Sequence, residues 1–288
     1  MSAVDDGLER QVAPGEGTER LTYGSYLYVP DLLALQRELS DPPHHDELLF
    51  IVSHQVYELW FKQMLHEVRA VCGFLDQDLP LRAAQLFDRL HAIQHLLIEQ
   101  IPLLETMFAV DFAKFRDHLR PASGFQSVQF RRLEFLCGAK NARLVQLVGE
   151  DEGSRAEMTA ALEEPTLYDH FLRHLARAGF AIPAEVLGRD TAEPYQPHEA
   201  VVDALVELYR ATDAHYPQFR LAEHLLELDE RFAIWRFHHV KMVERMIGGK
   251  TGTGGSSGAR YLASTLDKRF FPEIWMVRDR LTSGYGGA

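Results

Sequence analysis

The chain has 288 residues, of which 46% are hydrophobic, and this is enough length and apolar content for a substantial core. A formal net charge of −12, without clusters of lysine and arginine, argues against a nucleic-acid partner. No apolar run approaches the roughly 20 residues of a membrane span, and the N-terminus lacks a signal-peptide pattern, so we expect a cytoplasmic protein without a membrane partner.

The first part of the chain and the two cysteines set further limits. Residues 1–20 are polar and contain glycine and proline, which predicts a mobile N-terminal tail with order beginning near Leu21. Cys72 and Cys137 lie far apart and lack the CxxC spacing, so we expect buried thiols rather than a disulfide framework or a zinc ribbon.

From Leu21 onward the dominant spacing of apolar residues is helical. We expect a short helix over 30–39, and then a long one in which Asp41 is the cap, Pro42 lies in the first turn, and 44–47 (HHDE) form a solvated start. That helix runs to about Phe74. Further helices are predicted over 80–107, 111–119, 126–149, 155–163, 166–179, 197–213, 218–247 and 271–281.

No strand pattern competes with these helices. Long helices joined by short connections predict an all-α fold, with a single helical-bundle domain over 21–288 and an N-terminal arm. Nothing between the helices has the length or composition of an interdomain linker.

The run MIGGKTGTGGSSG, residues 246–258, is similar in composition to a phosphate-binding loop. A P-loop needs a glycine five residues before the Gly-Lys pair, and Glu244 occupies that position. The run also follows a helix rather than a buried strand, so we do not expect nucleotide binding. It is either a loose linker or a loop that closes over something.

The helix before this run carries an apolar stripe with a histidine at its centre. Leucine, phenylalanine, tryptophan and methionine recur at spacings of three and four around His239, whereas His238 lies among charged residues. Pattern alone favours a core histidine. The alternative is an axial ligand to the iron of a flat macrocycle, against which tryptophan and methionine can pack.

A second histidine, His54, shares a helix face with Phe50 and other aromatic residues. This arrangement suits a pocket for a planar aromatic ligand. It is equally typical of a histidine at the edge of the core that pairs with a carboxylate or a backbone group.

An arginine in DFAKFRDHLRPASGFQS also lies among apolar residues. Arg116 shares a face with Phe112 and Phe115, and a buried guanidinium needs an anionic partner. Pattern favours an internal Asp or Glu. The alternative is a ligand carboxylate, held beside the Ser123-Gly124 turn.

His91 and His95 are four residues apart on a predicted helix, a spacing at which two imidazoles can chelate a metal. The HExxH pattern is absent and no third motif with a carboxylate is evident, so we expect both histidines to be structural.

The chain as a whole resembles the tryptophan 2,3-dioxygenase family. The segments that carry the resemblance are LTYGSYL, HDELLFIVSHQVYELWFKQMLHE, FRDHLRPASGFQSVQFRRLEFLCGAKN, WRFHHVKMVERMIGGKTGTGGSSGARYLASTL and FFPEIWMVRDRL, which span most of residues 21–281. The resemblance implies an all-α homotetramer, built as a dimer of dimers, that binds haem b between its helices with ferrous iron in the active state. The missing CxxCH motif agrees with a haem that is not covalently attached.

By position, the resemblance makes His239 the axial ligand of the iron and gives Trp235 and Met242 to the same side of the porphyrin. The resemblance also implies that Ser123 and Gly124 lie beside the opposite, distal face. The implied reaction adds both atoms of O2 across the C2–C3 bond of L-tryptophan and gives N-formyl-L-kynurenine, the first step of tryptophan degradation by the kynurenine pathway.

The resemblance also assigns the substrate contacts. His54 matches the histidine that hydrogen-bonds the indole N–H, and Phe50 packs on the indole. Arg116 matches the arginine that holds the carboxylate, with Phe112 where some bacterial members carry a tyrosine. We expect that change to have a modest effect on affinity. The resemblance implies that Thr253 contacts the amino-acid backbone of the substrate. It also implies that Tyr23 and Tyr26 reach the site from the N-terminal arm of a neighbouring subunit.

Three other hypotheses remain open: a haem dioxygenase that acts on another indole, a haem sensor without catalysis, and a helical scaffold without a cofactor. A gas sensor has no need of an amino-acid clamp, which argues against the second. A Soret band would exclude the third.

Overall fold

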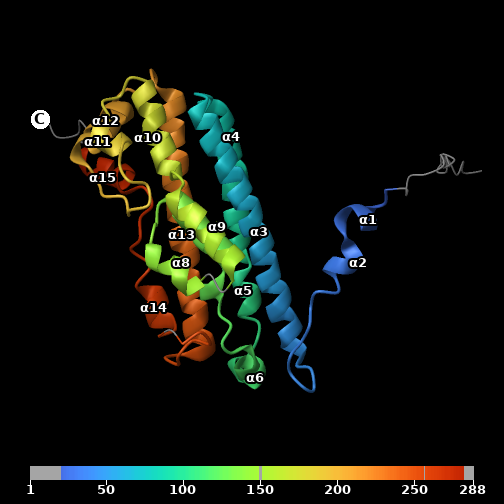
Figure 1. Ribbon diagram of the computed structural model, residues 1–288. Coiled ribbons are helices and arrows are strands. Elements are labelled where there is room, and N and C mark those ends of the chain that lie inside the picture. The colour runs from blue at the N-terminus through green and yellow to red at the C-terminus, as the bar shows by residue number, and fades with distance from the viewer. Residues whose placement is uncertain (1–20, 149–150, 256, 282–288) are drawn as a thin grey trace, which may run out of the picture. The chain divides into compact units, whose positions relative to one another are not determined.

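The computed structural model describes residues 21–148, 151–255 and 257–281, and every regular element within these ranges is a helix (Figure 1). The predicted all-α class is therefore confirmed. The chain divides into two compact units, residues 1–37 and residues 38–288. The expected mobile tail, residues 1–20, lies outside the described residues. No described helix is both long enough and apolar enough to cross a membrane.

The first unit contains two short helices, α1 (Tyr23–Leu27) and α2 (Val29–Leu32). Tyr28 separates them with a left-handed backbone, φ 53°. The expected helix over 30–39 is wrong beyond Leu32. The side-chain amide of Gln36 donates to the carbonyl of Leu32 at 3.0 Å, which occupies the acceptor that a further helical turn would use.

The long helix α3 (His45–Asp76) begins later than expected and is capped by His44 rather than Asp41. His45 is exposed, and His44 and Asp46 are half-buried, but Glu47 is 1% exposed, so the expectation of a solvated start is wrong for Glu47. Its carboxylate accepts hydrogen bonds from the backbone N–H groups of Leu39 and Ser40, at 2.7 and 3.0 Å, and from the Ser40 hydroxyl. These bonds tie Leu39 and Ser40 to the first turn of the helix.

The core of the second unit is built on α3, α4 (Pro80–Glu99) and α13 (Tyr216–Ile247), with α4 packed along both of the others (Figure 1). Around them lie α7 (Val128–Cys137), α9 (Glu152–Glu163), α10 (Leu167–Arg177), α12 (Glu199–Arg210) and α15 (Pro272–Arg280). The last four confirm the helices predicted over 155–163, 166–179, 197–213 and 271–281. Cys72 and Cys137 are buried free thiols, also as predicted, and burial raises the pKa of both.

The helix expected over 80–107 is interrupted at Gln100. A separate turn, α5 (Ile101–Leu104), follows it. Pro102 has no backbone N–H to donate to the carbonyl four residues earlier, and this breaks the helical ladder. The next helical stretch, expected over 111–119, is confirmed as α6 (Ala109–Phe115) followed by the 3₁₀ turn η1 (Arg116–Leu119).

The helix expected over 126–149 is also divided. A 3₁₀ turn, η2 (Gly124–Gln126), precedes α7, and α8 (Ala142–Val148) follows it. Gly138 ends α7 with φ +124°, and Lys140 then turns inward. Its buried ammonium donates to three carbonyls at the C-terminal end of α9, those of Ala161, Leu162 and Glu164, at 2.6–2.9 Å. A cation at the negative end of a helix is favourable, and this tertiary contact overrides the local helical pattern.

Two further short helices, α11 (Ala184–Leu187) and α14 (Ala259–Ala263), have no counterpart in the sequence pattern. The second of these matters for the site, because it follows the glycine-rich run and turns the chain back against the end of α13.

Candidate functional site

A mainly apolar cavity of about 290 Å³ lies between α3, α5, α6, α7, the C-terminal half of α13 and the glycine-rich loop. It brings together most of the predicted site residues, although they come from segments far apart in the sequence. The predicted residues that line it are Phe50, His54, Phe112, Arg116, Ser123, Gly124, Trp235, His239, Met242 and Thr253.

On the α13 wall, His239 lies one turn after Trp235, and the two rings stack at 5.4 Å between centroids with an interplanar angle of 10°. Neither ring nitrogen of His239 has a hydrogen-bond partner among the described residues. Burial, with a smaller contribution from the charge of nearby His54, lowers the pKa of His239 to about 4. The imidazole is therefore neutral at neutral pH, which is the form that binds a metal ion.

Sequence reasoning missed a charged cluster in the same wall. The Glu134 carboxylate accepts from Arg131 at 2.6 Å and from Arg236 at 3.3 Å, and all three residues line the cavity. One carboxylate thus faces two guanidinium groups, and Nη1 of Arg236 is buried without a hydrogen-bond partner among the described residues. The position of Arg236 three residues before His239, on the same helix face, was the available signal.

This wall fits a haem. A neutral histidine without a protein partner suits the axial position of an iron, and apolar side chains one turn away suit a porphyrin face. Haem also carries two propionate groups. The surplus positive charge of Arg131 and Arg236, and the unpartnered Nη1, match an anionic group of this kind.

The α3 wall holds His54 and Phe50, one turn apart, with ring centroids at 4.1 Å. His54 Nδ1 lies 2.7 Å from the Phe50 carbonyl oxygen. A carbonyl only accepts, so Nδ1 carries the hydrogen and Nε2 presents a lone pair. Burial lowers the pKa of His54 from its ordinary value of 6.5. One hypothesis for His54 was pairing with a backbone group, and this is observed at Nδ1. The other was a place in a ligand pocket, and His54 does line the cavity.

Arg116 begins η1 and is 9% exposed. Its Nη2 donates to the backbone carbonyl of Thr251, in the glycine-rich loop. The internal ion pair favoured by the sequence pattern is wrong, since Arg116 forms no salt bridge with an Asp or Glu of the described chain. A buried guanidinium at the cavity wall with only a carbonyl partner leaves donors for an external anion. The neighbouring Phe112 packs on Phe50, with centroids at 5.7 Å.

The glycine-rich loop closes against the turn that contains Ser123 and Gly124. The hydroxyl of Thr253 donates to the carbonyl of Ala122 at 2.6 Å. At Gly254 a Cβ atom would lie 2.6 Å from the Cβ of Ser123, so only glycine permits this close approach. Gly252 and Thr253 of the glycine-rich run line the cavity. This position agrees with the second hypothesis for the run, a loop that closes over a ligand, rather than with a loose linker.

Tyr23 and Tyr26 belong to the first unit, and 79% and 68% of their surfaces are exposed. Their predicted contact with a neighbouring subunit stays a prediction.

The comparison with known proteins agrees with this site. The family model described as tryptophan 2,3-dioxygenase matches residues 7–153 and 155–281. The tryptophan 2,3-dioxygenase of Kineococcus radiotolerans is 43% identical over 286 residues, covering 98% of this chain and 100% of that protein. The enzymes of the same name from Serratia proteamaculans and Myxococcus xanthus are 44% and 42% identical, over 92% and 95% of this chain and 94% and 95% of their own lengths. The chain therefore belongs to the tryptophan 2,3-dioxygenase family.

Proposed function

We propose that this protein is a haem-dependent dioxygenase that cleaves the C2–C3 bond of the indole ring of L-tryptophan with O2, giving N-formyl-L-kynurenine as the first step of tryptophan degradation. Family membership supports the reaction. The structural observation that carries it is the pairing of His239 on one wall of a cavity with His54 and Arg116 on the others. In this proposal the histidine that binds the metal and the residues that hold the amino acid line the same cavity.

The proposed cofactor is haem b. His239 would bind the iron, Trp235 and Met242 would contact the porphyrin, and Arg131 and Arg236 would pair with its propionates. When bound, the haem supplies a ferrous iron that binds and activates O2. The polypeptide holds the substrate, fixes its orientation and excludes water.

The substrate is held at both ends in this proposal. Phe50 packs on the indole while Nε2 of His54 accepts the indole N–H. Arg116 pairs with the carboxylate, and Thr253 contacts the amino-acid backbone. Phe112 contributes only apolar contact, because it has no hydroxyl, so the guanidinium of Arg116 holds the carboxylate without help from this position. The distal turn, Ser123 and Gly124, completes the pocket beside the porphyrin.

The proposal is tested by steady-state formation of formylkynurenine from L-tryptophan by the ferrous protein, followed by absorbance, together with the Soret band of the purified protein. A haem sensor gives the Soret band without the product. A dioxygenase for another indole gives product faster from a substituted tryptophan. Either result would replace the proposed substrate or activity.

We also propose that the working form is a cytoplasmic homotetramer, a dimer of dimers, in which Tyr23 and Tyr26 of one subunit complete the pocket of another. The support is the first unit itself, because α1 and α2 have no buried side chain among the described residues and expose large apolar ones. A molar mass by light scattering tests the assembly.

His54→Ser should lower kcat by about 10-fold, less than the roughly 100-fold or more expected for loss of a general base. The reason is that Nε2 orients the indole N–H rather than removing its proton. Since the pKa of His54 lies below 6.5, the acceptor form prevails at neutral pH. The kcat of the parent protein should be flat from pH 7 upward and should fall only on acidification. A pH profile of kcat for both proteins checks this.

The matched substrate for this test is 1-methyl-L-tryptophan, which has no indole N–H. The parent protein should discriminate between it and tryptophan more strongly than His54→Ser does. Equal discrimination by the two proteins would contradict the proposed hydrogen bond.

Gly254→Ala should raise the KM for tryptophan by between about 10- and 100-fold and leave haem binding unchanged. The new Cβ would meet the Cβ of Ser123 at 2.6 Å, so the loop must move away from the turn that it covers. Steady-state kinetics and the Soret band measure the two effects.

Gly249→Ala is the control within the same loop, because a Cβ there meets nothing within 4 Å. Equal KM values for the two variants would show that closure of the loop on Ser123 has no part in substrate binding.

A further inference from the structure

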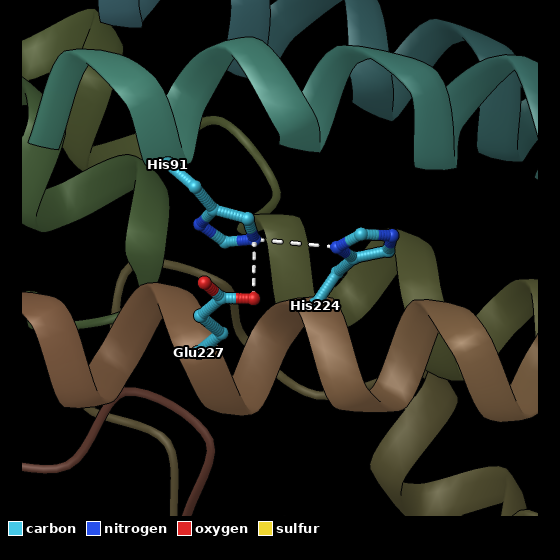
Figure 2. Close-up of side chains that lie close together, drawn as sticks. All are labelled: His91, His224 and Glu227. Atoms are coloured by element: carbon cyan, nitrogen blue, oxygen red, sulfur yellow. Dashed lines mark hydrogen bonds and ion pairs between the residues drawn. The ribbon is translucent and has the colours of Figure 1, made fainter. Parts of the chain in front are cut away.

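A cluster of metal-binding side chains lies outside the cavity, where α4 packs against α13. His91 comes from α4, and His224 and Glu227 come from the first half of α13, one turn apart (Figure 2). None of the three lines the cavity. Glu227 precedes His239 by 12 residues, which is about 18 Å along a helix at 1.5 Å per residue. The cluster is thus separate from the proposed haem site.

The distances within the cluster are those of ligands around one ion. His91 Nε2 lies 3.3 Å from His224 Nδ1 and 3.5 Å from Glu227 Oε2, and the three ligand atoms all lie within 4.8 Å of one another. A tetrahedral zinc ion with bonds of about 2.0–2.1 Å holds its ligands about 3.3 Å apart. As hydrogen bonds these contacts are long, since N–H···O distances fall at about 2.7–3.2 Å.

Surrounding residues orient the three ligands. Oε1 of Gln94 lies 3.3 Å from His91 Nδ1, and the Gln94 amide is itself fixed by donating to the Leu228 carbonyl at 2.9 Å. His91 Nδ1 therefore carries the hydrogen and Nε2 presents a lone pair to the cluster. Such outer hydrogen bonds are typical of metal-binding histidines. The ring of Phe87 stacks on His224 at 5.3 Å with an interplanar angle of 5°.

Charge also favours a cation at this point. With Nδ1–H directed at Gln94, Nε2 of His91 faces Oε2 of Glu227 at 3.5 Å. Both atoms are acceptors, so they form no hydrogen bond with each other, and both lone pairs attract a cation. Arg231 binds the other carboxylate oxygen, Oε1, at 2.8–2.9 Å and leaves Oε2 available.

One neighbour must move when a metal binds. Arg220 donates to Nε2 of His224 at 3.2 Å, which keeps the hydrogen on Nδ1. A metal on Nδ1 requires the other tautomer, so this contact has to open. Arg220 is exposed and is free to turn toward solvent.

We propose that His91, His224 and Glu227 bind a divalent transition-metal ion of the zinc class, which ties α4 to α13, with water as the fourth ligand. Two imidazoles and one carboxylate form a donor set that zinc accepts, whereas magnesium prefers oxygen ligands alone. The sequence predicts a structural role for His91, because the carboxylate ligand lies 136 residues away, on another helix.

The test measures zinc binding by the haem-loaded protein without an affinity tag, by equilibrium dialysis and elemental analysis at neutral pH. We expect one zinc per chain beyond the iron, and no uptake of magnesium. Zinc should also raise the melting temperature with the same concentration dependence. Glu227→Asp and His91→Gln should each weaken zinc binding by about 10-fold or more. His95→Ala, an exposed histidine on the same helix, is the matched control and should bind as the parent does.

Glu227→Asp keeps the charge but shortens the side chain, so it separates ligation from general attraction of cations. The Glu227 side chain is 41% exposed, and this variant should fold normally. The proposal is overturned if the parent binds no zinc, or if Glu227→Asp and His91→Gln bind it as tightly as the His95→Ala control.

Discussion

Replacing His239 with alanine should give a folded protein that no longer retains haem. The imidazole at this position is neutral, has no partner in the described chain and lies against the ring of Trp235. Loss of outer-shell partners alone costs metal sites about 10- to 100-fold in affinity, so loss of the proposed iron ligand should cost on the order of 100-fold or more. Haem content per chain, with far-ultraviolet circular dichroism for the fold, measures the effect.

Two comparisons make this test specific. His238→Ala removes the adjacent, exposed histidine and should leave haem content unchanged. Adding free imidazole to His239→Ala should restore part of the Soret band, because the small ligand enters the space left by the side chain. A His239→Ala protein with full haem content would refute the assignment of this residue and with it the proposed cofactor site.

The long helices could be predicted because their evidence is local. Apolar residues at spacings of three and four produce one buried stripe on α13, and the prediction over 218–247 differs from the observed Tyr216–Ile247 by two residues. The errors arise where a distant group takes part. Lys140 leaves a helical pattern because the end of α9 supplies three acceptors, and nothing in the local sequence indicates that partner.

The same distinction holds for the site. His239 and not His238 lies on the apolar face of its helix, and Phe50 and His54 share a face because they are four residues apart. Which of these side chains face the cavity could therefore be predicted from the sequence. For Arg116 the pattern favoured an internal acidic partner and left a ligand carboxylate as the alternative. Its observed partner is the carbonyl of Thr251, which belongs to a loop 135 residues away. A backbone acceptor has no signal in the side-chain pattern.

Clusters assembled from several helices were missed for a related reason. Arg131 and Glu134 on α7 meet Arg236 on α13, and each alone has the appearance of an ordinary surface charge. Only the packing of the two helices shows that two cations share one carboxylate at a cavity. Spacing within one element predicts neighbours well, whereas the register between elements depends on the whole core.

Arg116→Met should raise the dissociation constant of L-tryptophan by roughly 30- to 1000-fold, which corresponds to about 2–4 kcal/mol for a charge-assisted pair in a desolvated site. Methionine preserves the apolar contacts of the stem and removes the donors. Phe112 offers no hydroxyl to compensate. Titration of the ferrous protein with tryptophan under anaerobic conditions measures binding without turnover.

Arg116 has a second role that could mimic this result, since it also donates to the carbonyl of Thr251 and so holds the loop. Tryptamine, which lacks the carboxylate, separates the two. If Arg116 binds the carboxylate, the parent protein prefers tryptophan to tryptamine strongly and Arg116→Met loses that preference. If Arg116 only holds the loop, the substitution weakens both ligands by the same factor and the preference survives. The ratio of the two dissociation constants therefore decides between a substrate clamp and a loop support.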